Sequence, residues 1–162
     1  MHEATFSIRG GSSAYAAATA GTDATIELWC NDHCDLLYVT GDADDALDHV
    51  RDRVGVRASH RQGDERVVVT DACLLAHDDE GIETYLARHG CLLVPPLRYA
   101  AGATRCRVVA LDPADLTAVY RDLVADFSVT VESKRELAAP AHPTPLSGHD
   151  LPSLSPRQGE ML

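Results

Sequence analysis

The sequence predicts an α+β domain in which helices lie on one face of a mainly antiparallel sheet. Two observations lead to this class. Segments with apolar residues at every second position, which predict strands, alternate with segments whose apolar residues recur every three or four positions, which predict helices. Pairs of strands also follow one another without an intervening helix, as in antiparallel sheets. The expected order is strand, then strand–strand–helix–strand–strand, then helix–strand–strand–helix–strand.

The clearest hairpin lies in the first third of the chain. Ile26 and Leu28 share one face of a strand, and Leu37 and Val39 share one face of the next. A loop over residues 31–34 pairs Leu28 with Leu37 and Ile26 with Val39, so both apolar rows fall on one side of the sheet.

A helix and two more strands are expected after this hairpin. The period changes after Gly41 to that of a helix, with acidic residues at its N-terminal end. The apolar stripe of this helix consists of Ala43, Leu47, Val50 and Val54. Two strands follow near residues 56–60 and 66–71, joined by a turn at residues 62–64.

The second half of the chain repeats these element types. A short helical stripe is formed by Ile82, Tyr85, Leu86 and His89. Gly90 ends that helix, and a strand begins at residues 91–94. We expect Pro95-Pro96 to end regular pairing or to lie at a sheet edge, because proline lacks the N–H donor that the ladder needs. The halves 1–72 and 73–137 each suggest a ferredoxin-like or ACT-like arrangement.

The last elements are a strand, a long helix and a final strand. The strand covers residues 104–111, and the helix begins after Asp112 with Pro113 at its first position. The amphipathic stripe of this helix consists of Leu116, Val119, Tyr120, Leu123 and Phe127. Alternation over residues 128–133 predicts the closing strand.

The C-terminal segment has a different composition. Residues 138–153 contain four prolines and predict an extended linker. Residues 154–162 predict the truncated start of a further helix, with Ser155 as N-cap, Pro156 at the first position and Gln158 completing a capping box. We therefore expect the linker to lead into another domain.

The charge of the chain indicates a halophilic, intracellular protein. There are 25 acidic and 14 basic residues, a net charge of -11, and Lys134 is the only lysine. Such a surface stays hydrated in concentrated salt, and it argues against DNA binding by these residues, because affinity for phosphates needs clustered Lys and Arg. No signal peptide or membrane span is recognisable. We expect a cytoplasmic homodimer that does not bind membranes.

One Cys/His cluster carries candidate chemistry. Cys30, His33 and Cys34 fall in the predicted hairpin loop, where they could converge on zinc or iron, with Cys73, His77 or Cys91 completing the ligand set. Redox sensing by Cys30 and Cys34 is a second interpretation. Packing is a third, since Cys30 continues an apolar row and Cys106 shares the parity of a strand interior.

Signatures of enzymes are missing from the sequence. There is no nucleotide-binding glycine loop and no Gly-x-Ser-x-Gly elbow. A cysteine-dependent enzyme using Cys34 and His33 stays open, but adjacent residues at a turn are poorly placed as nucleophile and base. We expect that the protein is not an enzyme.

Four segments resemble one family of regulators. The segment LSPRQGEML at 154–162 looks like the start of the helix-turn-helix domain of haloarchaeal bacterio-opsin activator-type transcription regulators. The segments YLARHGC at 85–91 and PPLRY at 95–99 resemble the sensory parts that precede this domain. The segment WCNDHCDLL at 29–37 is similar to the subgroup that includes a proposed dimethyl sulfoxide reductase regulator.

The resemblance implies that this chain is the N-terminal sensory part of a DNA-binding regulator. DNA would be bound through the missing C-terminal domain and by no residue of this chain, while the Cys/His hairpin would receive a metal or redox signal. The alternative is a metal-free, ACT-like ligand-binding or dimerisation module with a pocket between its halves.

Overall fold

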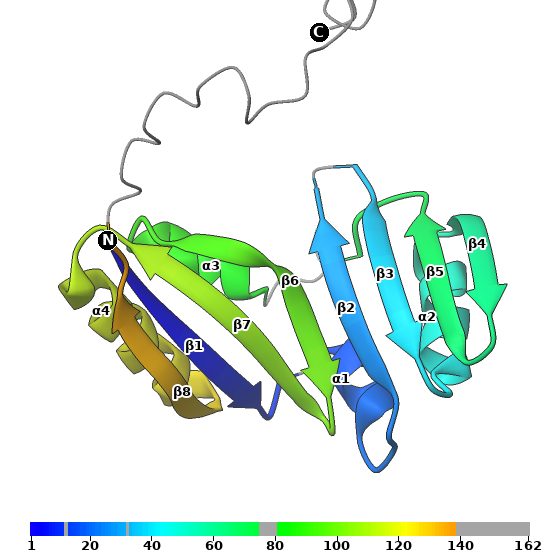
Figure 1. Cartoon of the computed structure of the whole chain (residues 1–162), viewed down its shortest axis with the longest axis horizontal. Coiled ribbons are helices and arrows are strands. Elements are labelled where there is room, and N and C mark those ends of the chain that lie inside the picture. The colour runs from blue at the N-terminus through cyan, green and yellow to red at the C-terminus, as the bar shows by residue number, and fades with distance from the viewer. Residues whose placement is uncertain (12, 32, 75–80, 139–162) are drawn as a thin grey trace, which may run out of the picture.

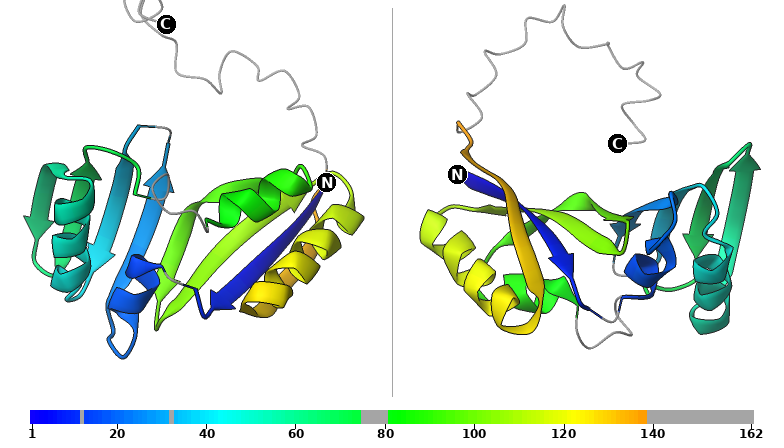
Figure 2. Two further views of the ribbon diagram at one scale, coloured as in Figure 1. Left: turned by 180° about the vertical axis from the view of Figure 1, so that it is seen from behind. Right: turned by 90° about the horizontal axis from the view of Figure 1, so that it is seen from below.

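The computed structural model describes residues 1–11, 13–31, 33–74 and 81–138, and it confirms the α+β class. Eight strands of the described residues form one antiparallel sheet, and four helices lie on one of its faces (Figures 1 and 2). The view from behind in Figure 2 has all four helices in front of the sheet. Residues 139–162, which include most of the expected linker and the expected helix start, lie outside the described residues.

The elements follow the predicted order with one addition. The strands are β1 (His2–Arg9), β2 (Thr25–Cys30), β3 (Asp35–Thr40), β4 (Val56–Gln62), β5 (Glu65–Thr70), β6 (Leu92–Ala100), β7 (Ala103–Ala110) and β8 (Ser128–Glu136). The helices are α1 (Ala14–Thr19), α2 (Asp44–Arg53), α3 (Ile82–Arg88) and α4 (Pro113–Asp126). The addition is α1, which the sequence pattern did not predict.

The strand order divides the sheet into two related units. The full order is β4-β5-β3-β2-β6-β7-β1-β8. The first unit, β1-α3-β6-β7-α4-β8, has the βαββαβ order of elements and the split pairing of a ferredoxin-like fold. The second unit, α1-β2-β3-α2-β4-β5, gives the same pairing if β5 is counted first, so it is a circular permutation of the same arrangement. Because β1 pairs with β7 and β8, pairing groups the start of the chain with its second half.

The two units join through β2 and β6, which pair antiparallel at the centre of the sheet. On the other side of β2, the predicted hairpin register is confirmed: Leu28 pairs with Leu37, and Ile26 pairs with Val39. All four side chains are at most 1% exposed. One hydrophobic core between sheet and helices runs through both units.

Of the two expectations for Pro95-Pro96, the interruption of regular pairing is confirmed and the position at a sheet edge is wrong. β6 continues through both prolines and is a central strand, between β2 and β7. Its pairing with β7 is irregular between Val94 and Arg98, and its pairing with β2 begins at Leu97. The prolines therefore lie where both ladders are interrupted. At this position no neighbouring strand needs the N–H groups that proline lacks.

The first and last helices, α1 and α4, each begin with a capping side chain. In α4 the Asp112 side chain accepts a hydrogen bond from the Ala114 N–H at 2.9 Å, as expected of an N-cap. α1 spans six residues and is capped by Ser13, whose hydroxyl accepts from the Ala16 N–H at 3.3 Å. So short a helix depends on packing, and its Tyr15 is 1% exposed.

The face of the sheet opposite the helices carries ion pairs. The Glu3 carboxylate is buried and receives Arg107 at 3.0 Å and Arg135 at 2.9 Å. Burial acts to raise the pKa of Glu3, but hydrogen bonds and charge from the two arginines outweigh it and lower that pKa. This group fastens β1 to both of its neighbours, β7 and β8.

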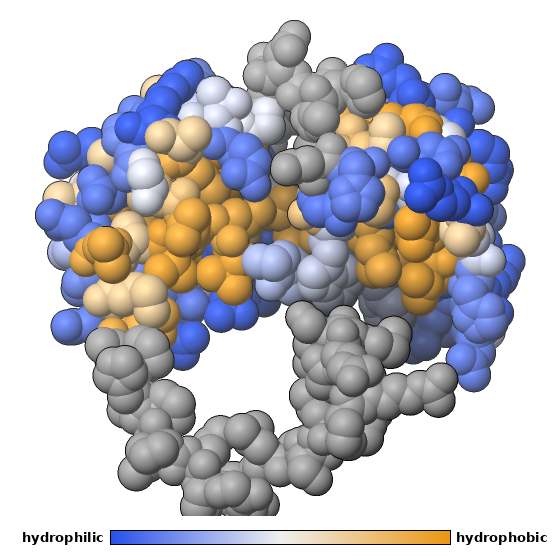
Figure 3. All heavy atoms as spheres, turned by 90° about the horizontal axis from the view of Figure 1, so that it is seen from above, coloured by the Kyte–Doolittle hydropathy of each residue, from blue (hydrophilic) through white to orange (hydrophobic). Residues whose placement is uncertain are grey.

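Apolar side chains also reach the surface. Trp29 and Leu36 are each 38% exposed and pair across β2 and β3. In the view from above, hydrophobic residues are visible over both units (Figure 3). None of the described helices is long and apolar enough to cross a membrane.

Candidate metal site

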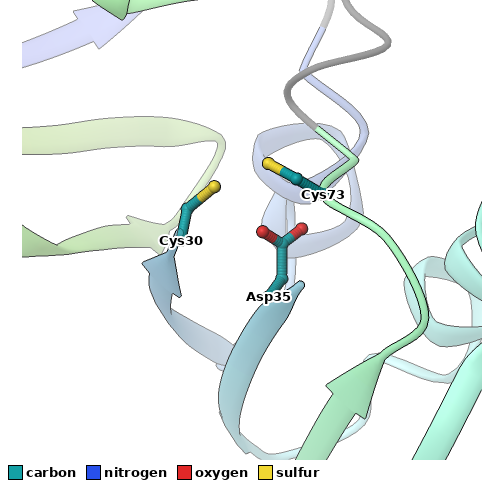
Figure 4. A group of neighbouring side chains, drawn as sticks. All are labelled: Cys30, Asp35 and Cys73. Carbon is teal, nitrogen blue, oxygen red and sulfur yellow. The ribbon is translucent and has the colours of Figure 1, made fainter. Parts of the chain in front are cut away.

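Three side chains of the second unit converge where strand β2 ends and strand β3 begins. The Cys30 Sγ, one Asp35 carboxylate oxygen and the Cys73 Sγ all lie within 4.8 Å of one another. Figure 4 shows the two thiols and the carboxylate pointing toward a common space. We call this group the thiol–carboxylate cluster.

Strand pairing positions the first two members. Cys30 ends β2, Asp35 begins β3, and the two residues are direct partners in the hairpin register. The loop between them closes around Asn31, whose side-chain oxygen accepts from the N–H groups of His33 at 3.0 Å and Cys34 at 2.9 Å. This turn holds the ends of the strands together, so Cys30 and Asp35 remain side by side.

The segment after β5 positions the third member. The Thr70 hydroxyl accepts from the Asp35 N–H at 2.8 Å and donates to the Ala72 carbonyl at 2.7 Å. The Leu74 N–H donates to Asp35 Oδ2 at 2.9 Å. Cys73 lies between these two anchors and is 6% exposed. The backbone thus wraps around Asp35 and directs Cys73 to it.

One oxygen of the buried Asp35 carboxylate lacks a hydrogen-bond donor among the described residues, whereas the other accepts from the Leu74 N–H. Asp35 is 0% exposed, and within the described part of the chain its Oδ1 has no hydrogen-bond donor. The hydroxyl of Tyr15 is buried and also without a hydrogen-bond partner among described residues. Burial, and then the nearby charge of Asp35, raise the pKa of Tyr15. A buried carboxylate oxygen without a donor is costly, and a bound cation would offset that cost.

The state of the thiols bears on their chemistry. Burial of the Cys30 sulfur raises its pKa strongly, and the neighbouring Cys73 and Asp35 side chains raise it further. A raised pKa makes the thiolate scarce and the cysteine slow toward oxidants. A metal ion reverses this balance, because coordination deprotonates the thiol.

The cluster combines one exposed residue, Cys30, with two buried ones, Asp35 and Cys73. Cys30 as a residue is exposed, since it lies at the end of β2, although its sulfur points toward the two buried partners (Figure 4). Two sulfurs and one carboxylate oxygen suit a soft or borderline divalent ion. In tetrahedral zinc coordination such atoms lie about 3.5–3.8 Å apart, so a small approach of the side chains would close the site and leave a fourth position open.

The other predicted members of the hairpin site lie elsewhere. His33 is exposed and Cys34 is partly exposed, and neither joins Cys30 in a described group of three ligand atoms. Neighbouring residues of an extended chain face opposite sides, and Cys34 directly precedes the inward-facing Asp35. The hairpin therefore contributes Cys30 and Asp35. His77 lies outside the described residues.

Two further cysteines belong to the core. Cys91 is 6% exposed at the start of β6, and its N–H donates to the Leu86 carbonyl at 3.0 Å. Cys106 in β7 is 1% exposed, as its parity in the strand predicted, and burial raises its pKa to about 12. The structure does not bring Cys91 into the thiol–carboxylate cluster.

Sequence reasoning missed Asp35, although a signal was present. Asp35 has the same parity as Leu37 and Val39, so it is an acidic residue in an inward row. A charged residue at an inward position of a strand rarely lacks a partner. That rule would have added Asp35 to the candidate ligands.

The fold and the thiol–carboxylate cluster define a two-unit α+β domain with a candidate metal site. The chain belongs to the family described as HVO_A0563, N-terminal, a haloarchaeal family name, whose model matches residues 3–146. No curated protein and no solved structure matches the chain.

Proposed function

We propose that this chain is the signal-sensing domain of an archaeal DNA-binding transcription regulator, and that its signal is a soft divalent metal ion held by Cys30, Asp35 and Cys73. The observation that carries the proposal is the buried Asp35 carboxylate, which has an unpartnered oxygen and two thiols beside it. Zinc and ferrous iron are the candidate ions.

The regulatory part of the proposal has separate support. The description of the family as N-terminal fits a module that precedes another region. The segment at 154–162 resembles the first helix of a helix-turn-helix domain of the bacterio-opsin activator type. With a net charge of -11, the chain leaves contact with DNA to another domain.

Metal binding is favoured over direct oxidation as the signal. An oxidant sensor needs an exposed cysteine with a lowered pKa, whereas the pKa of Cys30 is raised and Cys73 is buried. The same burial suits a metal site, where an apolar surrounding strengthens binding of the deprotonated ligands.

Metal content of protein purified without oxygen tests the site. We expect about one zinc or iron ion per wild-type chain and at least tenfold less in Cys30→Ser and Cys73→Ser. The matched control is Cys34→Ser, which alters a thiol of the same hairpin outside the cluster and should keep its metal. Negligible metal in all four proteins, or equal loss in Cys34→Ser, would overturn the assignment.

The regulatory role is tested in cells with the whole gene. If the domain controls transcription through the cluster, Cys30→Ser and Cys73→Ser change the same transcripts that metal limitation changes, and Cys34→Ser does not. Identical transcript profiles for wild type and a gene deletion, with and without the metal, would exclude regulation by this protein.

A further inference from the structure

A second site lies where the two units meet, on the helix-covered side of the sheet. A cavity of about 170 Å³ is bounded by β1, α1, α3, α4 and the central strands β6 and β7. The thiol–carboxylate cluster does not line it. Its walls come from both units.

The lining of this cavity determines what it can accept. None of the fifteen lining residues carries a charge. Large apolar groups come from Ile8, Ile82, Leu97, Leu123 and Phe127, and most other positions are glycine or alanine. Such walls exclude ions, which would lose their hydration without gaining a charged partner.

A few hydroxyl groups interrupt the apolar surface. Ser13, Tyr99 and Thr104 are the lining residues that carry a hydroxyl group. Tyr99 is 2% exposed, and a hydrogen bond from Ser13 partly offsets the effect of burial, which raises the pKa of Tyr99. Few polar groups in an apolar pocket are typical of sites that orient a small ligand through one or two hydrogen bonds.

We propose that this cavity binds a neutral, largely apolar small molecule about the size of one substituted aromatic ring, with a single hydrogen-bonding group. The size agrees with the rule that an apolar cavity of about 150 Å³ accommodates benzene. Phe127 and Tyr99 are aromatic lining residues, and an aromatic ligand can pack against such side chains. This site is independent of the metal site.

The probe is benzyl alcohol, with benzoate as its charged counterpart of similar shape. We expect saturable shifts of the amide resonances of lining residues with a Kd of about 1 mM or tighter for benzyl alcohol, and binding at least tenfold weaker for benzoate. Contacts between the probe and the rings of Phe127 and Tyr99 should appear in nuclear Overhauser spectra. Absence of saturable binding, or equal binding of benzoate, overturns the proposal.

Two variants locate the binding. Ala17→Leu adds volume to an exposed lining position of α1 and should weaken benzyl alcohol binding about tenfold, whereas Ala125→Leu on the exposed face of α4 should not. If Ala17→Leu fails to fold, Gly11→Ala replaces it, since its new Cβ would lie 3.4 Å from Phe127 Cε1 inside the cavity. Unchanged binding in the folded variant contradicts the site, and Cys30→Ser should bind the probe normally whether or not the metal site is correct.

Discussion

Replacing Asp35 by asparagine tests the electrostatic argument directly. Asparagine keeps the size of the side chain and a carbonyl oxygen for the Leu74 N–H, but it removes the buried charge. A buried polar atom without a partner costs about 1–3 kcal/mol, and Asp35 Oδ1 is such an atom in the metal-free protein. We therefore expect metal-free Asp35→Asn to unfold with a free energy within about 1 kcal/mol of wild type, or above it.

With zinc bound, we expect wild type to be more stable than Asp35→Asn. At a zinc concentration of about 100 times the Kd, wild type gains about 2.7 kcal/mol, which raises Tm by about 5–11 °C in a chain of this length. Loss of a residue that only hydrogen-bonds a metal ligand weakens metal affinity by about 10–100-fold. Loss of one of the three ligands themselves should weaken it at least as much, so we assume a Kd about 100-fold higher for the variant. At the same zinc concentration the variant then gains only about 0.4 kcal/mol, or about 1–2 °C.

Thermal unfolding followed by circular dichroism, with zinc and with a chelator, gives both quantities. Asp23→Asn is the control, because Asp23 is an exposed carboxylate in a loop. An equal zinc-induced rise in Tm for Asp35→Asn and wild type would refute the role of the carboxylate as a ligand. A metal-free variant less stable than wild type by about 3 kcal/mol would refute the claim that Asp35 Oδ1 has no partner in the metal-free protein.

Two further predictions concern stability. Glu3→Gln should cost about 1–3 kcal/mol at pH 7, because the neutral amide cannot form charge-assisted hydrogen bonds with both Arg107 and Arg135. The pKa of Glu3 is lowered in the folded state, so this difference in stability should be complete above the ordinary pKa of about 4.3 and vanish as pH falls through the lower folded value. Urea unfolding of both proteins at several pH values measures the difference. A difference that persists in acid would contradict the prediction. Val119→Ala should cost about 2 kcal/mol, because Val119 is 0% exposed, whereas Val124→Ala on the same helix should change stability by less than about 0.5 kcal/mol. Equal losses in chemical denaturation would show that α4 packs by another face.

The fold was largely predictable because most elements carry local signals. Alternation fixed the register of β2 and β3, and capping by Asp112 marked the start of α4. α1 escaped prediction because six residues give too little periodicity, and its helical state depends on burial of Tyr15. For β6 the break in pairing at Pro95-Pro96 was predictable, but its central place in the sheet was not, because that place depends on pairing with β2 and β7.

The candidate site was less predictable, since it depends on contacts distant in sequence. Cys30 and Cys73 were among the predicted ligands, but only the wrapping of residues 70–74 around Asp35 places Cys73 beside Cys30. Cys34 was grouped with Cys30 by nearness along the chain, although the alternation of faces separates them. Nearness in sequence did not predict which side chains meet at the turn between β2 and β3, where the chain reverses direction.

The two edge strands of the sheet limit how this domain can associate with another protein. Joining the units through β2 and β6 leaves β4 and β8 as the outer strands. β4 carries Arg57, His60 and Arg61, and β8 is almost fully exposed and rich in charge. Charged outer strands resist pairing with the strand of another molecule. Association of this domain should therefore use its broad surfaces, the helices on one side or the Trp29–Leu36 side of the sheet on the other.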